Sequence, residues 1–243
     1  MTSLGDEGTE LLVLAGGFGT RLRAAVADVP KPLAPIHGRP FLEFQIAHWI
    51  KQRVTSMTFL LYYEAEKIQS FLDAMQREAA RGGCRLRSVV EPSPLGTGGA
   101  IAHAVRRLEL SGTFIVANAD TWLGGGVQDV SQSASPAVAV VAVEDVSRYG
   151  SVRLRGDRVV EFTEKSSNTG RKWINGGLYH LHADLFRDWD GKSYSLEREL
   201  LPKLSSDGRL WAVRLQTDFV DIGVPEDYFR FCRWIDSGRV AAL

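Results

Sequence analysis

The first half of this 243-residue chain alternates short apolar runs with amphipathic stretches, and this alternation is its strongest constraint on the fold. The apolar runs have the length of strands and end at glycine or polar turn residues, while the stretches between them have helical spacing. Strands that alternate with helices are typical of a doubly wound parallel sheet. The predicted strands are 10–14, 58–63, 85–91 and 113–117, and the predicted helices are 41–51, 64–81 and 99–108.

The second half is richer in strands, which indicates a mixed, partly antiparallel extension of the same sheet. Its predicted strands are 137–143, 151–155, 159–163, 178–181 and 211–215, and a last helix is predicted over 225–237. No repeat or linker separates the halves. We therefore predict one α/β domain over residues 1–243, a Rossmann-like three-layer fold with a mixed, mainly parallel central sheet.

Composition excludes several classes of function. Lys and Arg number 29, and Asp and Glu also number 29, so the formal net charge is zero. A neutral chain argues against nucleic acid and anionic membranes as partners, because both attract a basic excess. The N-terminus lacks the pattern of a signal peptide, and no apolar run approaches membrane-spanning length, so a cytoplasmic protein is expected. Cys84 and Cys232 lie far apart in sequence, which argues against a disulfide scaffold or structural zinc.

Three loops follow predicted strands, and in a parallel sheet such loops meet at one edge. They are Ala15–Thr20, Glu91–Gly99 and Asn118–Thr121. The first belongs to the stretch Leu-Ala-Gly-Gly-Phe-Gly-Thr-Arg-Leu, whose glycines allow backbone N–H groups to approach phosphate oxygens, with Arg21 as a charged donor. The alternative is a tight turn with an incidental arginine. The loop is not a dinucleotide-binding fingerprint, because Leu22 stands where that motif needs glycine. It is not a Walker A loop either, because no Gly-Lys-Ser/Thr follows.

Lys31 lies between Pro30 and Pro32, which should hold it extended and aim its charge, although a solvated loop lysine is the alternative. Residues 15–40 carry four basic side chains against one acidic side chain, a local charge of +3. Asp120 and Asp221 each end a predicted strand, where an Asp is often only a helix cap or turn residue. Two such residues near a phosphate loop favour a Mg²⁺ site, because Mg²⁺ takes one or two carboxylates plus phosphate oxygens.

Residues 14–22, followed by Pro30-Lys-Pro-Leu33, resemble the N-terminal signature of the sugar-1-phosphate nucleotidyltransferases, and the resemblance extends to about residue 230. These enzymes join a nucleoside triphosphate to a sugar 1-phosphate and release pyrophosphate. The resemblance implies the nucleotide-diphospho-sugar transferase type of fold. It also implies a nucleotide-binding part over about 10–135 and a sugar-phosphate-binding part over about 136–243.

The resemblance assigns roles residue by residue. The implied nucleotide-binding residues are Leu14, Ala15, Gly16, Gly17, Gly19, Thr20, Glu91, Gly96 and Thr97. The implied catalytic residues are Arg21, Lys31, Asp120 and Lys165, with Asp120 and Asp221 as Mg²⁺ ligands. The implied sugar-phosphate residues are Gly150, Glu164, Lys165, Asn175 and Gly176. Without the resemblance, the stretches around Gly150 and Asn175 would be interpreted as turns, and Glu164-Lys165 as a surface ion pair.

Glu91 stands where thymidylyltransferases of similar pattern have glutamine. A carboxylate accepts from the two adjacent donors of guanine, N1–H and the amino group, which favours GTP as substrate. The motif wording is most similar to guanylyltransferases of D-glycero-α-D-manno-heptose 1-phosphate, which make GDP-heptose for capsule or surface glycans. Mannose-1-phosphate guanylyltransferase and glucose-1-phosphate thymidylyl- or uridylyltransferase are the alternatives. A non-catalytic sugar-nucleotide sensor and a nicotinamide dehydrogenase are less favoured, and a homodimer is a candidate assembly.

Overall fold

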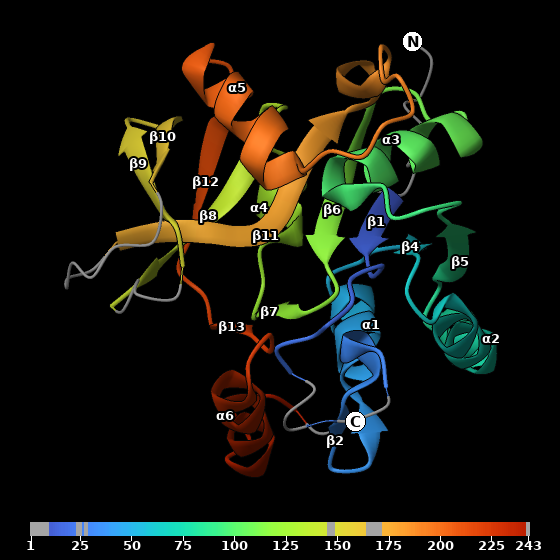
Figure 1. Cartoon of the computed structure of the whole chain (residues 1–243). Helices are drawn as coiled ribbons and strands as arrows, with labels where there is room; N and C mark the ends of the chain where they lie inside the picture. The colour runs from blue at the N-terminus through green and yellow to red at the C-terminus, as the bar shows by residue number, and fades with distance from the viewer. Residues whose placement is uncertain (1–9, 23–25, 27–28, 145–148, 164–171, 242–243) are drawn as a thin grey trace, which may run out of the picture.

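The structure is a computed structural model that describes residues 10–22, 26, 29–144, 149–163 and 172–241. Its centre is a nine-stranded sheet with the order β5-β4-β1-β6-β11-β8-β12-β10-β9 (Figure 1). The strands are β1 (Glu10–Leu14), β4 (Ser56–Leu61), β5 (Arg85–Val90), β6 (Thr113–Asn118), β8 (Ala137–Val143), β9 (Ser151–Arg155), β10 (Arg158–Thr163), β11 (Lys172–His182) and β12 (Trp211–Leu215).

The sheet is mixed but mainly parallel, as the sequence predicts. Strand β1 pairs in parallel with β4 and β6, and β4 pairs in parallel with β5. Strand β11 is antiparallel to both β6 and β8, and β8 is parallel to β12. The strands β10 and β11 therefore run against the others. The carboxyl ends of β1, β4, β5 and β6 consequently lie at one edge, where ligands bind in sheets of this kind.

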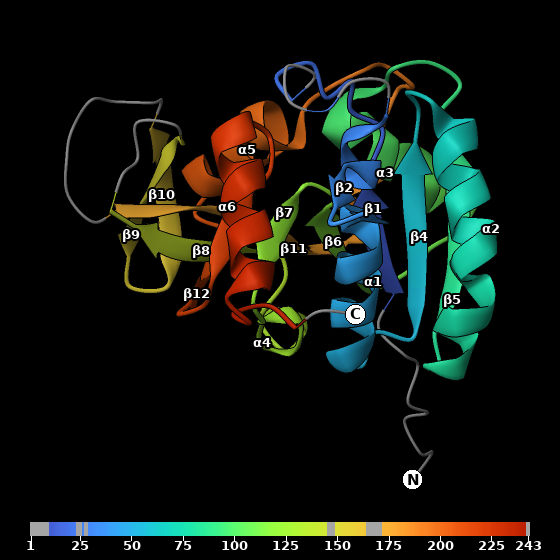
Figure 2. The same cartoon turned by 90° about the horizontal axis from the view of Figure 1, so that it is seen from below.

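Helices cover both faces of the sheet (Figures 1 and 2). One face packs against α1 (Phe41–Lys51), α2 (Ala65–Arg81) and α4 (Val127–Ser131), and the other against α3 (Gly96–Arg107) and α5 (Leu201–Ser206). After Glu10, strand β1 is apolar because Leu11 and Val13 enter the first core and Leu12 enters the second. In the described part of the chain, none of these helices has the length and apolar character needed to span a bilayer.

A third, aromatic core lies outside the sheet and supports the loops at its edge. It joins α1 to the last helix, α6 (Pro225–Asp236), where the rings of Phe41 and Phe231 have centroids 4.8 Å apart. It also contains Trp122 of β7 (Thr121–Leu123) and Val220 of β13 (Phe219–Asp221), two short strands that pair with each other. The remaining short elements are η1 (Lys31–Leu33), β2 (Pro35–Ile36), β3 (Arg39–Pro40), η2 (Ala183–Phe186) and η3 (Leu196–Leu200).

Local details differ from the sequence predictions in several places. Helix α3 begins at Gly96 and not at 99, so its glycines form the first helical turn. The turn predicted around Asn175 and Gly176 is wrong, because both residues lie inside the long strand β11. The glycines coincide with a shift in the pairing register of β11 and β8 between Asn175 and Tyr179, so the strand is irregular there but is not interrupted by a turn. The short helices α4 and α5 were not predicted.

Val116 tests the burial of the central strands. It lies fully buried in β6, whereas Val90 at the end of the edge strand β5 is 44% exposed. We expect Val116→Ala to lower the free energy of unfolding by about 2 kcal/mol or more, because two buried methyl groups are lost and a cavity remains. The matched change Val90→Ala should cost less than about 0.5 kcal/mol. Urea unfolding measures both values, and equal losses would contradict this assignment of the core.

Candidate active site

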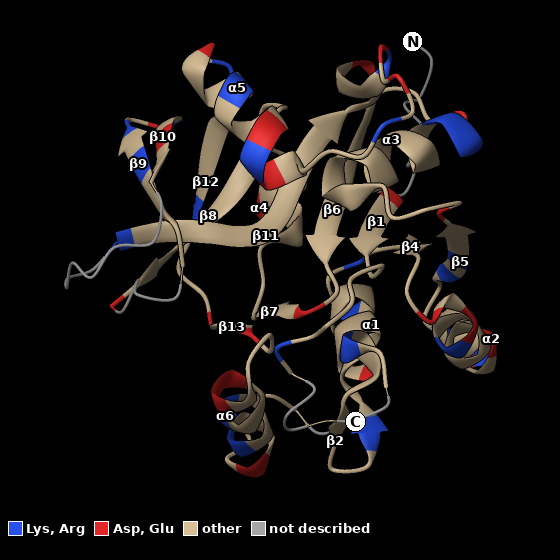
Figure 3. Ribbon diagram, in the orientation of Figure 1, with Lys and Arg blue, Asp and Glu red and all other residues tan. Residues whose placement is uncertain are grey.

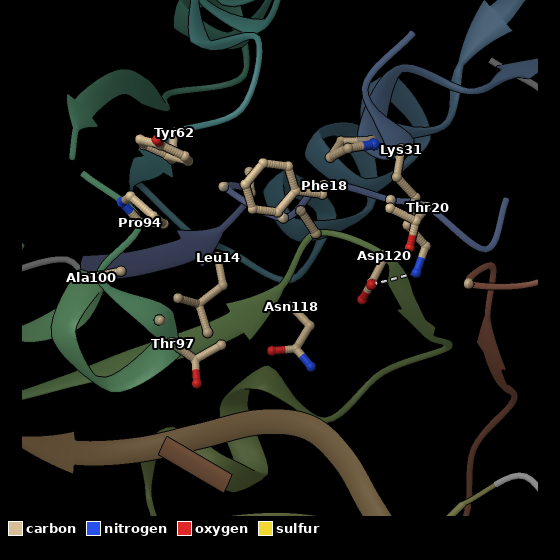
Figure 4. A pocket seen from close by; sticks show the side chains of 18 of the residues that line it. Leu14, Phe18, Thr20, Lys31, Tyr62, Pro94, Thr97, Ala100, Asn118 and Asp120 are labelled. Carbon is tan, nitrogen blue, oxygen red and sulfur yellow. Dashed lines mark hydrogen bonds and ion pairs between the residues drawn. The ribbon is translucent and has the colours of Figure 1, made fainter. Parts of the chain in front are cut away.

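A cavity of about 440 Å³ opens at the carboxyl ends of β1, β4, β5 and β6 (Figure 4). All three loops that the sequence singled out contribute to its wall, so their predicted convergence is confirmed. The described residues that line it are Leu14, Ala15, Gly16, Gly17, Phe18, Gly19, Thr20, Arg21, Lys31, Pro32, Tyr62, Glu91, Pro94, Gly96, Thr97, Ala100, Asn118, Ala119, Asp120, Glu197 and Gly223.

The glycines of the first loop have different reasons to be glycine. A Cβ atom at Gly16 would lie 2.8 Å from Oε1 of Glu91 and 3.2 Å from the backbone nitrogen of Tyr62, so the fold leaves no room there. Gly19 has a φ of +61°, a left-handed conformation that glycine adopts readily. A Cβ atom at Gly17 would meet no protein atom within 4 Å. Gly17 is therefore not required by packing, and it lines the cavity.

Lys31 has a rigid backbone, but the conformation differs from the prediction. Pro30 is extended, with a ψ of 142°, whereas Lys31 itself begins the 3₁₀ turn η1 and is not extended. The turn closes through the N–H of Leu33, which donates to the carbonyl of Pro30 at 2.8 Å. Proline at the second position of the turn is compatible with this geometry because its missing N–H has no partner to lose.

The ammonium group of Lys31 joins the two aspartates predicted as metal ligands. Its Nζ lies 2.5 Å from Oδ2 of Asp120 and 3.2 Å from Oδ1 of Asp221, and its side chain is only 9% exposed. In Figure 3, acidic segments beside β7 and β13 lie next to a basic segment of the neighbouring loop. Three segments that are distant in sequence therefore meet at one charged cluster.

The β7–β13 ribbon explains why the aspartates meet. Asp120 directly precedes β7, and Asp221 ends β13, where it pairs with Thr121. The N–H of Ile222 donates to the backbone carbonyl of Asp120 at 2.9 Å, which fixes the distance between the two residues. The strand that ends at Asp221 is predicted from the sequence and is confirmed as β13. Its partner β7 and the pairing of the two are not predicted, because Thr-Trp-Leu is too short to give a strand pattern.

The electrostatics of the cluster favour added positive charge. Burial raises the pKa of the Asp221 carboxyl, the nearby charge of Asp120 raises it further, and Lys31 and the N–H of Gly223 act against this shift. One ammonium neutralises only one of the two carboxylates. Gly223 lets the Arg21 guanidinium approach the cluster as a second positive charge, because a Cβ atom there would lie 2.8 Å from Nζ of Lys31 and 3.3 Å from Nη2 of Arg21.

Glu91 begins the second loop, and its carboxylate already supports that loop. Its side chain is buried, and its Oε2 accepts a hydrogen bond from the N–H of Leu95 at 2.9 Å. Burial raises the pKa of Glu91, and the Leu95 N–H partly offsets the shift. The other oxygen, Oε1, lies against the backbone of Gly16. Glu91 thus connects the two glycine-containing loops, a structural role that the sequence did not indicate.

Residues 192–197, here called the strap, cross the beginning of α3. The carbonyl of Tyr194 accepts from the N–H groups of Gly98 and Gly99 at 3.1 and 3.4 Å, and any Cβ atom at Gly98 would overlap the Tyr194 ring. These two glycines therefore serve packing, and their N–H groups are already bonded within the protein. Thr97 donates to Oε2 of Glu197 at 2.6 Å, which brings a strap carboxylate to the cavity wall.

The predicted sugar-phosphate residues are not all brought to this cavity. Glu164 and Lys165 lie outside the described residues. Gly150, Asn175 and Gly176 are not among the described residues that line the cavity. Asn175 bonds within the fold, because its Nδ2 donates to the hydroxyl of Tyr179 and its Oδ1 accepts from the N–H of Gly177. Its contacts therefore shape β11, and a direct role in binding stays a prediction.

Comparison with known proteins identifies the family. The nucleotidyl transferase family model matches residues 10–238. The chain belongs to this family. It is 33% identical to a D-glycero-alpha-D-manno-heptose 1-phosphate guanylyltransferase of Campylobacter jejuni, over 91% of this chain and 98% of that one. It is 31% identical to mannose-1-phosphate guanyltransferase beta-B of Xenopus laevis, covering 94% of this chain but 65% of the longer relative.

Among solved structures, HddC from Yersinia pseudotuberculosis, complexed with GMP-PN, is similar to this chain. It has a TM-score of 0.80 and 34% identity, over 93% of this chain and 98% of that one. A UDP-glucose pyrophosphorylase with a TM-score of 0.76 and 18% identity shares the fold. The predicted family and the predicted fold class are thereby confirmed.

Nucleotidyl transferases of this family generally use a divalent metal ion, and the charged cluster fits one. Asp120 and Asp221 already converge on one cation, because the Lys31 ammonium lies within bonding distance of both. No group of three or more His, Cys, Asp or Glu side chains suited to a metal occurs among the described residues. A metal held here would take its remaining ligands from phosphate oxygens and water, as Mg²⁺ commonly does.

Alanine substitutions at Gly16 and Gly17 distinguish a glycine needed for packing from a glycine needed for ligand binding. We expect Gly17→Ala to leave the free energy of unfolding within about 0.5 kcal/mol of wild type, because its methyl group meets no protein atom. The same methyl group should weaken nucleoside triphosphate binding about tenfold, because it would separate a bound phosphate from the N–H groups of the loop. Gly16→Ala should instead cost about 1–3 kcal/mol of stability. Urea unfolding and calorimetric titration measure these effects, and unchanged nucleotide affinity in Gly17→Ala would contradict the phosphate role of the loop.

Proposed function

We propose that this protein transfers GMP from GTP to a sugar 1-phosphate and releases pyrophosphate, and that the sugar is D-glycero-α-D-manno-heptose. The observation that carries the proposal is the Lys31–Asp120–Asp221 cluster, whose Lys31 and Asp120 line the same cavity as the glycine loop and Arg21. A site for a triphosphate needs fixed cations and backbone donors on one side and metal-binding carboxylates on the other. The heptose guanylyltransferase of Campylobacter jejuni and the GMP-PN complex of HddC support the choice of guanine and heptose.

The residues would divide the triphosphate between them. The N–H groups of residues 16–20 and the guanidinium of Arg21 would bind the β- and γ-phosphates, and Lys31 would neutralise charge at the α-phosphate. Asp120 and Asp221 would hold Mg²⁺, which supplies charge neutralisation for the phosphate oxygens when it is bound. Leu14, Ala15, Gly96 and Thr97 would contact the nucleoside.

The chemistry would be an in-line displacement. An oxygen of the sugar phosphate forms a bond to the α-phosphorus of GTP, and the bond from that phosphorus to the β-phosphate oxygen breaks. The attacking oxygen is already ionised at neutral pH, so the chain needs no general base. Catalysis of this kind is mainly positioning and charge stabilisation. We propose that Lys165 holds the attacking phosphate and that Glu164, Gly150, Asn175 and Gly176 contribute to the sugar side.

The two functional parts would share one sheet. Residues 10–135 would supply the nucleotide site and residues 136–243 the sugar-phosphate site. Strand β11, from the second part, pairs with β6 from the first, which supports their operating as one unit. Mannose 1-phosphate is the second candidate substrate, because mannose-1-phosphate guanylyltransferases match almost the whole chain at about the same identity.

A pyrophosphate-release assay tests the activity. The protein is incubated with Mg²⁺, each nucleoside triphosphate and a panel of sugar 1-phosphates. We expect the highest kcat/KM with GTP and heptose 1-phosphate, with mannose 1-phosphate as the second-best acceptor. If kcat/KM is instead highest with mannose 1-phosphate, the heptose part of the proposal is contradicted and mannose 1-phosphate is the substrate. No release with any pair would contradict catalysis and favour a sugar-nucleotide sensor.

The substitution Glu91→Gln tests whether Glu91 recognises the guanine base. The amide can still accept from Leu95 through its oxygen, so the loop should persist. It cannot accept both guanine donors, so we expect kcat/KM with GTP to fall about tenfold to a hundredfold and with UTP or dTTP less than threefold. Because the pKa of Glu91 is raised, GTP affinity should decline with falling pH earlier than for an ordinary glutamate. That decline should be absent in the glutamine variant, and equal losses for all nucleotides would contradict base recognition by Glu91.

Asp120→Asn tests the charged cluster in catalysis. We expect kcat to fall on the order of 10²–10³-fold, as when other charge-stabilising groups are removed, and the same loss for Arg21→Ala. Asp129→Asn is the matched control, because Asp129 lies exposed on α4 away from the cavity wall. Steady-state kinetics and circular dichroism separate activity from folding. A near-normal kcat in Asp120→Asn would refute its role.

Lys31→Met tests the metal site without relying on turnover. The ammonium of Lys31 competes with a divalent ion for the oxygens of Asp120 and Asp221. In the absence of nucleotide, we therefore expect the methionine variant to bind Mn²⁺ about tenfold or more tightly than wild type, as measured by electron paramagnetic resonance. Lys67→Met is the control, because Lys67 pairs with Glu64 outside the cavity. Equal Mn²⁺ affinity in wild type and Lys31→Met would contradict the site.

A further inference from the structure

Phe18 is a large apolar side chain in a loop that otherwise consists of small and polar residues. It is 49% exposed and lines the cavity, together with Tyr62 (Figure 4). Phosphate binding by the glycine loop does not explain it, because a phenyl ring offers neither charge nor a hydrogen-bond donor. Exposed apolar surface inside a binding cavity is typical of a surface that a ligand covers.

Two tyrosines hold the Phe18 ring in place. Its centroid lies 5.9 Å from that of Tyr62, with the rings edge to face at 77°, and 5.3 Å from that of Tyr63, at 48°. Both distances are within the range of favourable aromatic contacts. The ring is therefore supported by the residues that directly follow β4, and it lines the cavity with about half of its surface exposed.

The aromatic residues adjoin the group proposed to read the base. The backbone of Gly16 lies between them, because a Cβ atom there would be 2.8 Å from Oε1 of Glu91 and 3.3 Å from Cβ of Tyr62. A base that donates to Glu91 would thus lie beside Tyr62, and Phe18 packs against Tyr62. The edge of the base and its flat face would meet different side chains of this cavity.

We propose that Phe18 and Tyr62 form an aromatic wall that packs against the face of the nucleobase and makes the site selective for a purine over a pyrimidine. The proposal rests on the proposed function in taking the ligand to be a nucleoside triphosphate. Stacking is tolerant of base identity because every base has a π-face, but a two-ring base covers more of the wall. The wall selects for size and Glu91 selects for the guanine edge.

Calorimetric titration of GTP, ATP and UTP in the absence of sugar phosphate tests the wall. We expect Phe18→Ala to weaken GTP and ATP binding about tenfold and UTP binding less than threefold. Tyr62→Leu should show the same order of losses. Phe18→Tyr should keep near-normal affinities because it keeps the ring. Thermal unfolding of each variant checks that the half-exposed position is not needed for folding.

Phe229→Ala is the matched control, since Phe229 is 50% exposed on α6 and is not among the described residues that line the cavity. It should leave all three affinities unchanged. Equal losses for GTP, ATP and UTP in Phe18→Ala would overturn the proposal and leave Phe18 a support of the loop. Unchanged affinity for all three nucleotides in Phe18→Ala would also overturn the proposal. These binding results are independent of pyrophosphate release, so selective purine losses without turnover would uphold the wall while contradicting the proposed activity.

Discussion

The buried ammonium of Lys31, held between two carboxylates, is the interaction on which the arrangement of the site depends. It connects the loop after β1, the end of β6 and the end of β13, which no continuous secondary structure joins. A buried charge is costly unless it is paired, so this cluster strongly favours one arrangement of the three segments. The rigid turn η1 behind Lys31 and the β7–β13 ribbon behind the aspartates reduce the number of alternatives further.

The aromatic core outside the sheet gives that ribbon its support. Val220 and Phe231 come about a hundred residues after Trp122 in the sequence, yet all three pack in one cluster. The sheet alone positions the ends of its strands, whereas Asp221 lies beyond the sheet. The C-terminal helix therefore contributes to the site through packing, although none of its residues is among the described residues that line the cavity.

The parallel half of the fold could be predicted because its signals are local. Buried strands such as β1 are continuous apolar runs, and α1 has helical spacing that gave both of its ends. The positions of the glycine loop, Glu91 and Asp120 at the cavity followed from topology, since loops after parallel strands share an edge, whereas Lys31 was singled out by its flanking prolines and the family resemblance. Pairing between distant short segments leaves no periodic signal. The β7–β13 ribbon, the bulged passage of β11 through Asn175 and the contact of the strap with Gly98 could not be predicted for this reason.

The strap has a consequence for redesign of the protein. Its Tyr194 carbonyl and ring occupy the space that Gly98 and Gly99 leave open, and Thr97 bonds both to the Glu197 side chain and to the N–H of Leu196. Residues 91–99 and 192–197 are thus complementary surfaces that were shaped together. A loop graft intended to change base preference would have to carry both segments from the same donor, because either one alone would meet a surface made for a different partner.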